Sequence, residues 1–224
     1  MNNYKKYTSK YLRKKILFPS ISITNLFIII NILVFLLFHI FYLFKIDLTN
    51  YLAVNPSSIA QGKYIWTLLT SVFTHYYFWH LVVNMISLMF IGNFVEKIIG
   101  KKRFIWFYLL SGIFASLFFV LFAFLFKQET NIYAVGASGA LFALGGLLMV
   151  LLPKLKVYVF FFIPMQLWMG MIFMLGVLWL ASIGVGLPIG NTAHLGGLIL
   201  GLLYGLYLRK RYRKKVTLLN NLFR

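Results

Sequence analysis

The chain has 224 residues, of which 62% are apolar, 19% are aromatic and only 11% are charged. Soluble domains average about 25% charged residues, and a compact chain of this size must keep much of its surface in water. The composition therefore predicts an integral membrane protein. It excludes a disordered chain, an ordinary soluble enzyme and, because there is no cysteine, a disulfide scaffold.

The first 20 residues form a basic tail that is followed directly by an apolar stretch. A signal peptide begins in this way, but the stretch is too long for the apolar region of a signal peptide, and no small-residue cleavage pattern follows it. We therefore interpret residues 1–20 as a retained cytoplasmic tail and the stretch as a membrane anchor.

Six apolar stretches have lengths that suit transmembrane helices, since the hydrocarbon core requires about 20 residues. The fifth lies within the long apolar run 157–187, which has Pro164 near its start. We expect an all-α membrane domain over residues 21–208, followed by a second basic tail over 209–224. Its helices are expected at 21–44, 79–95, 104–126, 135–152, 165–185 and 192–208.

The connection between the first two spans, residues 45–78, is the longest. It is too apolar and aromatic for a plain solvated linker, as Tyr51, Tyr64 and Trp66 show. Trp and Tyr are favoured where a membrane meets water, so we expect a partly helical element at that interface. His75, in the same connection, is expected to be an interface residue.

The loop charges predict the orientation of the chain. All but three of the 22 Lys and Arg residues lie in the two tails, in the loop after the second span or in the loop after the fourth. The other connections hold only Lys45, Lys63 and Lys127. The positive-inside rule then places both termini in the cytoplasm. A net charge of +19 divided in this way does not indicate a nucleic-acid partner.

Polar side chains occur near the start of every second span. His80 and Asn84 open the second span, Ser138 opens the fourth and His194 opens the sixth. Because these three spans run from outside to inside, all four residues are expected to lie at one depth, near the outer surface. Polar groups inside a membrane are costly and usually have a function.

Ser138 and His194 would supply a nucleophile and a base, since an imidazole in hydrogen-bond reach can take the proton of a serine hydroxyl. His80 and Asn84 are spaced i, i+4 and therefore share a helix face. Both can donate hydrogen bonds, and with the backbone N–H of Ser138 they could hold an oxyanion.

Glycines near these residues favour close backbone approach: Gly136 and Gly139 flank Ser138, and Gly197 and Gly201 form a small-xxx-small stripe on the sixth span. Each feature also has a purely structural interpretation. A membrane serine often bonds its own helix backbone, and a membrane histidine is often structural. Their coincidence at one depth favours a built site.

The chain has only three acidic residues, Asp47, Glu96 and Glu129. We expect a dyad without a carboxylate, with Glu96 as a structural charge and Glu129 in solvent. The sequence has no H-E-x-x-H motif and only one aspartate, which excludes a metalloprotease of that type and a two-aspartate protease. A Ser–Lys dyad is excluded too, because Lys154 lies about 24 Å along the helix from Ser138. No cofactor or metal is expected.

At these positions the sequence resembles the rhomboid family of intramembrane serine proteases. The segment 136–139 matches the family's G-x-S-G motif, and His80 with Asn84 matches H-x-x-x-N. Ala193 and His194, followed by Gly197 and Gly201, match the sixth-helix motif. The segment from Trp66 to His75 is similar to the first-loop signature. The resemblance covers roughly residues 50–207.

The resemblance implies a minimal six-helix rhomboid-like bundle, with Ser138 as nucleophile, His194 as general base and His80 and Asn84 as oxyanion donors. Its partners would be transmembrane protein substrates that enter sideways from the membrane lipids, past the fifth helix. Two positions depart from the family pattern. Thr67 follows Trp66 where Arg is frequent, and Phe142 stands where some members have a tyrosine packed on the histidine.

Two other functions are compatible with a polytopic membrane protein. A non-catalytic rhomboid-like protein would bind client transmembrane helices without cutting them, although such proteins usually lack the serine or the histidine. An ion-coupled transporter commonly has carboxylates at mid-membrane, and none of the three acids falls there. The composition, rich in Lys, Asn, Ile and Phe, favours a bacterial cytoplasmic membrane over an organelle membrane. It makes no prediction of the oligomeric state.

Overall fold

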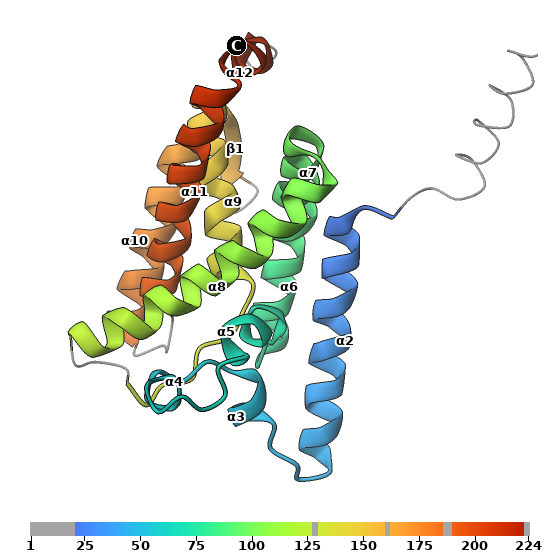
Figure 1. Cartoon of the computed structure of the whole chain (residues 1–224), viewed down its shortest axis with the longest axis vertical. Coiled ribbons are helices and arrows are strands. Elements are labelled where there is room, and N and C mark those ends of the chain that lie inside the picture. Colours follow the sequence, from blue (N-terminus) through green and yellow to red (C-terminus); the bar gives the residue numbers. More distant parts are fainter. Residues whose placement is uncertain (1–20, 127–129, 160–161, 186–189, 222–224) are drawn as a thin grey trace, which may run out of the picture.

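The computed structural model describes residues 21–126, 130–159, 162–185 and 190–221, and these are mainly helical (Figure 1). The predicted tail 1–20 and Glu129 lie outside the described residues. Within these described residues, four helical segments are long and apolar enough to cross a membrane. They correspond to the first, second, third and fifth predicted spans and cover Ile23–Leu43, Phe78–Ile99, Lys101–Leu125 and Leu167–Gly184.

The first of these segments is α2 (Ile23–Leu43). The hydroxyl of Ser22 accepts a hydrogen bond from the backbone N–H of Asn25 and so caps the helix. Most of its apolar side chains are exposed, and only Thr24, Phe27, Asn31 and Phe38 are buried. An apolar surface of this kind suits contact with lipid, because a helix facing water would present polar residues on its outer side.

A buried carboxylate holds the start of α2. Glu96, on α7 (Asn93–Ile99), accepts hydrogen bonds from the backbone N–H groups of Ile23 at 3.0 Å and Thr24 at 2.8 Å. It also accepts one from the Thr24 hydroxyl at 2.7 Å. The first N–H groups of a helix lack partners within the helix and carry its positive end, so a carboxylate is favoured there. Glu96 thus joins two segments of the membrane domain.

Glu96→Gln is expected to lower the free energy of unfolding by about 1–3 kcal/mol, because it removes a charge that satisfies otherwise unpaired buried donors. Thermal unfolding in detergent would measure the change. Asp47→Asn is a matched control, since Asp47 is exposed and accepts a bond from the Thr49 N–H at 2.8 Å. Equal losses in the two variants would contradict the role of Glu96.

The second predicted span is one continuous but irregular helix. It runs from α6 (Phe78–Ser87) through a π-helical turn, η2 (Leu88–Gly92), into α7. The third span is α8 (Lys101–Leu125), which crosses the other helices diagonally in Figure 1. The fifth is α10 (Leu167–Val185).

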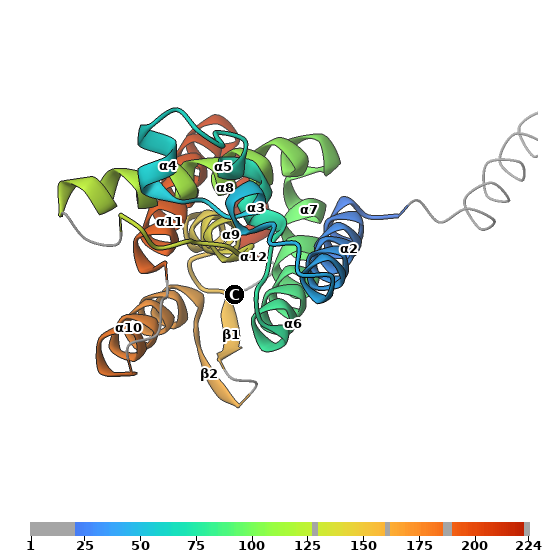
Figure 2. The same cartoon turned by 90° about the horizontal axis from the view of Figure 1, so that it is seen from below.

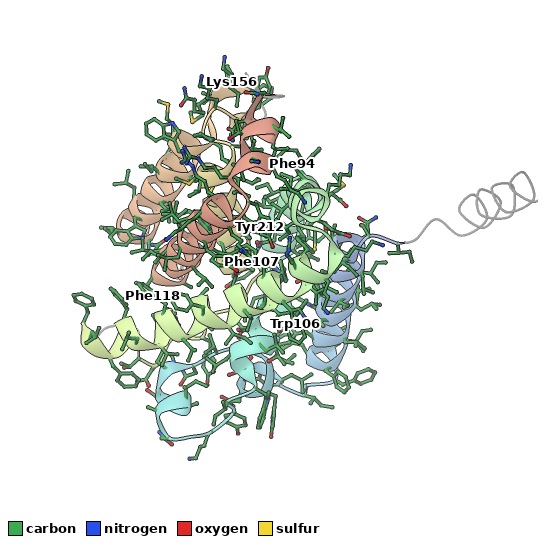
Figure 3. The ribbon with its side chains drawn as sticks, turned by 45° about the horizontal axis from the view of Figure 1, so that its top comes forward. Phe94, Trp106, Phe107, Phe118, Lys156 and Tyr212 are labelled. Atoms are coloured by element: carbon green, nitrogen blue, oxygen red, sulfur yellow. The ribbon has the colours of Figure 1, made fainter. Side chains whose placement is uncertain are left out.

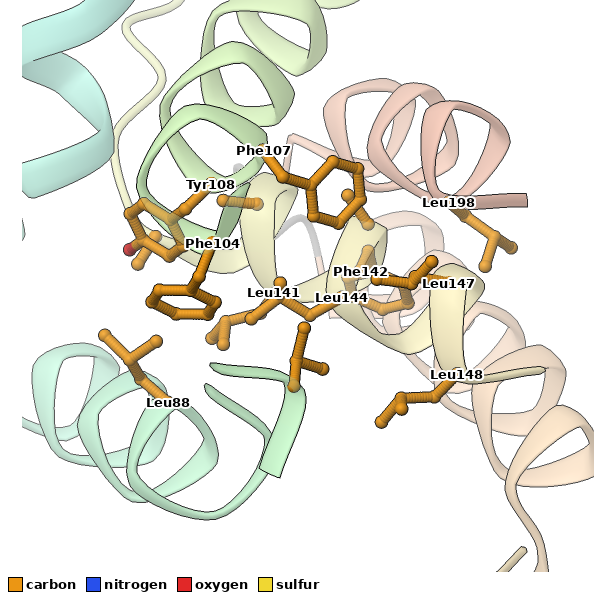
Figure 4. Packing of buried hydrophobic residues seen from close by; sticks show 14 of the residues in the cluster. Leu88, Phe104, Phe107, Tyr108, Leu141, Phe142, Leu144, Leu147, Leu148 and Leu198 are labelled. Atoms are coloured by element: carbon orange, nitrogen blue, oxygen red, sulfur yellow. The ribbon is translucent and has the colours of Figure 1, made fainter. Parts of the chain in front are cut away.

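The fourth predicted span corresponds to α9 (Ser138–Leu151), which lies at the centre of the helices (Figure 2). Every residue from Gly139 to Leu148 is buried, and the leucines of α9 pack against α8, α11 and η2 (Figure 4). A helix that is apolar on all sides is stable when it is surrounded. With 14 residues it is only about 21 Å long, shorter than the hydrocarbon thickness.

The predicted start of the fourth span at residue 135 is too early. Residues 135–137 are not helical, and Ala134 forms an isolated β-bridge with Val54. The sixth predicted span corresponds to α11 (Asn191–Arg211), which continues beyond the predicted end at residue 208. A further helix, α12 (Arg213–Asn221), follows it, so the described part of the basic tail is helical.

The connection 45–78 is partly helical, as expected. It contains four short helices, which lie below α8 in Figure 1. Among them, α4 and α5 pack against α8. Their bounds are α3 (Thr49–Leu52), α4 (Pro56–Ala60), α5 (Thr67–Thr70) and η1 (Ser71–Phe73).

The expectation of an all-α fold is wrong in one place. A small antiparallel hairpin, β1 (Lys156–Val159) and β2 (Ile163–Gln166), precedes α10. Pro164 lies opposite Tyr158 in this hairpin. A proline is tolerated in an edge strand, as in this two-stranded sheet, but not inside a helix. The valines and the tyrosine of β1 favour a β-strand. The apolar run from residue 157 therefore divides into a hairpin and a helix.

Candidate active site

Ser138 and His194 meet where α9 and α11 begin. Ser138 is the first residue of α9, and His194 lies in the first turn of α11. The Ser138 Oγ is 2.7 Å from the His194 Nε2, which is a hydrogen-bond distance. The structure therefore brings together two polar side chains that are 56 residues apart in the sequence.

This meeting depends on direct backbone contact between α9 and α11. A Cβ atom added at Gly197 would overlap the carbonyl oxygen of Gly139, and one added at Gly201 would overlap that of Ala143. Small residues allow two membrane helices to approach in this way. The glycine stripe thus brings the first turns of the two helices within hydrogen-bond reach.

The surroundings of His194 are largely apolar. Its imidazole is 6% exposed and stacks on the ring of Phe142, with centroids 4.7 Å apart and planes 21° apart. Its Nδ1 has no hydrogen-bond partner among the described residues. The carboxylates of Asp47 and Glu96 bond elsewhere, to Thr49 and to the start of α2. Phe142 therefore orients the imidazole by stacking.

The absence of a side chain at Gly136 lets the His80 imidazole lie close to the loop before Ser138. Its φ of 120° lies in a region that favours glycine. A Cβ atom there would lie 2.7 Å from the His80 Nε2 and 3.7 Å from the Ser138 Oγ. The backbone N–H of Gly136 donates to the Ser71 carbonyl at 2.8 Å, which fixes the loop. Any side chain at position 136 would overlap the His80 imidazole.

Asn84 is buried on α6, one turn after His80. Its Nδ2 donates a hydrogen bond to the His80 carbonyl at 2.8 Å. The amide carries a second N–H, which that bond leaves free for another acceptor. The structure thus places Asn84 beside His80, on a helix that packs against α9.

His75 is a site residue that the sequence interpretation missed. It was expected at the membrane interface, but its side chain is fully buried. Its Nε2 accepts a hydrogen bond from the backbone N–H of Ala137 at 3.4 Å, and its ring lies 4.9 Å from that of His80. It therefore supports the residue directly before Ser138. Its position at the end of the Trp66–His75 signature was the available signal.

Acid is expected to destabilise the fold through His75. Burial, with a smaller contribution from His80, lowers the pKa of His75 from 6.5 to about 3. Between pH 3 and pH 6.5, His75 therefore binds a proton in the unfolded chain but not in the folded chain. Stability is complete above about pH 6.5 and falls by at most about 1.4 kcal/mol per unit as the pH drops toward 3.

Melting temperatures of the wild type and His75→Gln, measured in detergent between pH 7 and pH 4, would test this expectation. Glutamine can still accept the Ala137 N–H but does not titrate. The variant should lose less stability on acidification. Identical pH slopes in the two proteins would show that His75 does not carry the effect.

Comparison with known proteins identifies the family. A model of the Rhomboid domain matches residues 62–211, which include His80, Asn84, Ser138 and His194.

Within the described residues, no group of three or more His, Cys, Asp or Glu side chains is arranged to hold a metal ion.

Three relatives show the range of the matches. The chain is 35% identical over 153 residues to Rhomboid protein 1, mitochondrial, of Saccharomyces cerevisiae, covering 66% of this chain and 43% of the relative. It is 34% identical over 153 residues to Rhomboid protease GluP of Bacillus subtilis, covering 66% of this chain and 27% of the relative. It is 36% identical over 97 residues to Inactive RHOMBOID-like protein 8 of Arabidopsis thaliana, covering 43% and 26%.

The chain spans less than half the length of each of these relatives. They include one relative named as a protease and one named as inactive. Because the domain model matches well over half of the sequence, this chain belongs to the rhomboid family of integral membrane proteins.

Proposed function

We propose that this protein is an intramembrane serine endopeptidase that cleaves transmembrane segments of other membrane proteins. The observation that carries the proposal is the distance of 2.7 Å between the Ser138 Oγ and the His194 Nε2. Neutral His194 accepts the hydroxyl proton as Oγ attacks the scissile carbonyl carbon. It then gives the proton to the leaving amine, and water hydrolyses the resulting acyl-enzyme.

The oxyanion of the tetrahedral intermediate would lie beside Gly136, near His80 and Ser138. The His80 Nε2 lies close to Gly136, and the backbone N–H of Ser138 is the first of α9. Asn84 would contribute the amide hydrogen that its bond to His80 leaves free. Donors held in place before the reaction stabilise developing charge most effectively, and the positive end of α9 adds to them.

We further propose that α2, the α6–α7 segment, α8, α9, α10 and α11 are six spans, with both termini cytoplasmic and the Ser138–His194 site near the outer face. The loop charges support this orientation. Substrates would be transmembrane proteins that reach the site from the lipid. The relatives include a mitochondrial protein as well as a bacterial one, so the predicted bacterial cytoplasmic membrane gains no support from them.

The second candidate is a rhomboid-like protein that binds client transmembrane helices without cutting them. The similarity to Inactive RHOMBOID-like protein 8 supports this second candidate. The two candidates differ in whether the Ser138 hydroxyl is nucleophilic, since a binder needs no activated serine.

The purified full chain in liposomes should cleave a single-span reporter whose outer half carries helix-weakening residues. A serine-directed fluorophosphonate probe should label the same preparation at Ser138. Cleavage with labelling would support the protease. Labelling without cleavage would indicate an unsuitable reporter sequence, and absence of both would favour the binder.

A further inference from the structure

A cavity lies away from the Ser138–His194 site, where α8 and α11 cross. It has a volume of about 440 Å³, which is within the range of small-molecule sites. Tyr204 in its wall is ten residues after His194 on α11, so the cavity lies about 15 Å farther along that helix. The cavity is lined by Lys102, Arg103, Trp106, Phe107, Leu110, Leu200 and Tyr204.

One end of this cavity is strongly cationic. Lys102 and Arg103 lie in the first turn of α8, where the positive end of the helix dipole adds to their charge. Arg103 donates to the Tyr212 hydroxyl at 2.8 Å, and the Lys215 ammonium lies 6.0 Å from the same ring. Figure 3 labels Trp106 and Phe107 on α8 and Tyr212 at the end of α11.

No carboxylate neutralises this end of the cavity within the described residues. Glu96 bonds the start of α2, and Asp47 bonds Thr49 beyond the opposite end of that helix. Neither Lys102 nor Arg103 forms an ion pair with a described residue. The cluster therefore favours an anion.

The rest of the cavity changes from aromatic to aliphatic along the two helices. Lys102, Trp106 and Leu110 are spaced i, i+4 and i+8 and so follow one face of α8. Trp106 and Leu110 are 59% and 55% exposed, which leaves this side open to lipid. The rings of Phe107 and Tyr204 stack at 4.6 Å and join the two walls.

The order from cation through aromatic ring to leucine is the order of a phospholipid from headgroup through interface to acyl chain. Trp and Tyr are favoured at the level of the headgroups, and basic pockets between membrane helices bind anionic headgroups. We propose that this cavity binds one anionic phospholipid, with its phosphate on Lys102 and Arg103 and an acyl chain along Leu110 and Leu200.

Native mass spectrometry of the full chain in detergent would test the proposal. The probes are phosphatidylglycerol and phosphatidylcholine with identical acyl chains, titrated separately. The wild type should bind one phosphatidylglycerol in preference to phosphatidylcholine. Lys102→Gln with Arg103→Gln should weaken phosphatidylglycerol binding about 30-fold, at about 1 kcal/mol for each cation and 1.4 kcal/mol per tenfold.

The matched control is Lys154→Gln with Lys156→Gln, which removes the same charge from the turn before β1 and the first residue of β1, and should leave the affinity unchanged. Lys102→Gln alone breaks no hydrogen bond of the described residues and should weaken binding about 5-fold. Equal losses in both double variants would show diffuse charge attraction and overturn the proposal. Equal affinity of the wild type for the two lipids would overturn it as well.

Discussion

Ser138→Ala is expected to abolish cleavage of a membrane-spanning reporter while the protein remains folded. The change removes only the hydroxyl oxygen that lies 2.7 Å from the His194 Nε2. Loss of the nucleophile from a serine–histidine pair lowers kcat by about 10⁶-fold in soluble serine proteases. Initial rates in liposomes would measure the loss, and the melting temperature of the variant would show that the fold persists.

The companion variant is His194→Ala. Residues that act as one unit are not additive, so the Ser138→Ala, His194→Ala double variant should be no slower than either single variant. A surviving rate in Ser138→Ala would remove Ser138 from the role of nucleophile. Independent losses that multiply in the double variant would mean that the two side chains do not act together.

Gly197→Ala is expected to lower both stability and activity, because its new Cβ atom would overlap the carbonyl oxygen of Gly139. Backbone atoms cannot move aside as a side chain can, so α11 must shift away from α9. Overpacking costs about 1–3 kcal/mol, occasionally more. A displacement of about 1 Å between Ser138 and His194 would cost about 100-fold in rate.

Melting temperatures and reporter cleavage, measured on the same preparations, would test this expectation. Gly176→Ala is the matched control, since a Cβ atom at this position of α10 would meet nothing within 4 Å. Gly201→Ala should behave as Gly197→Ala does, because it would overlap the Ala143 carbonyl. A harmless Gly197→Ala would show that the glycine stripe does not set the distance between the two helices.

At this site the backbones of α9 and α11 lie in direct contact, and the His194 side chain is buried. α9 needs no polar face because neighbouring helices cover it. Its first residue is nevertheless Ser138, which forms a hydrogen bond with His194 of α11. Phe142 supports the imidazole by stacking, whereas a soluble triad uses a carboxylate. In the proposed protease, the packing of apolar helices would therefore replace part of the hydrogen-bond network that orients a catalytic histidine in water.

Several features were visible in the sequence because they depend on local composition. Hydropathy identified the membrane class and the positions of the long helices, since the requirement for about 20 apolar residues is a property of one segment. Ser138, His194 and the Gly197–Gly201 stripe stood out because polar and small residues are conspicuous in an apolar background. The span order and the loop charges predicted a common depth for Ser138 and His194, whereas their contact depends on the packing of α9 against α11.

Only the tertiary structure decided the features that depend on distant partners. His75 lies in a loop that looked interfacial, yet it is buried because Ala137, 62 residues away, offers it an N–H. Glu96 is stable in a buried position because α2 begins beside it. α9 can be shorter than the hydrocarbon thickness because other helices enclose it. Hydropathy is the sum of each segment's own transfer energy, whereas these features arise from pairs of segments that meet only after folding.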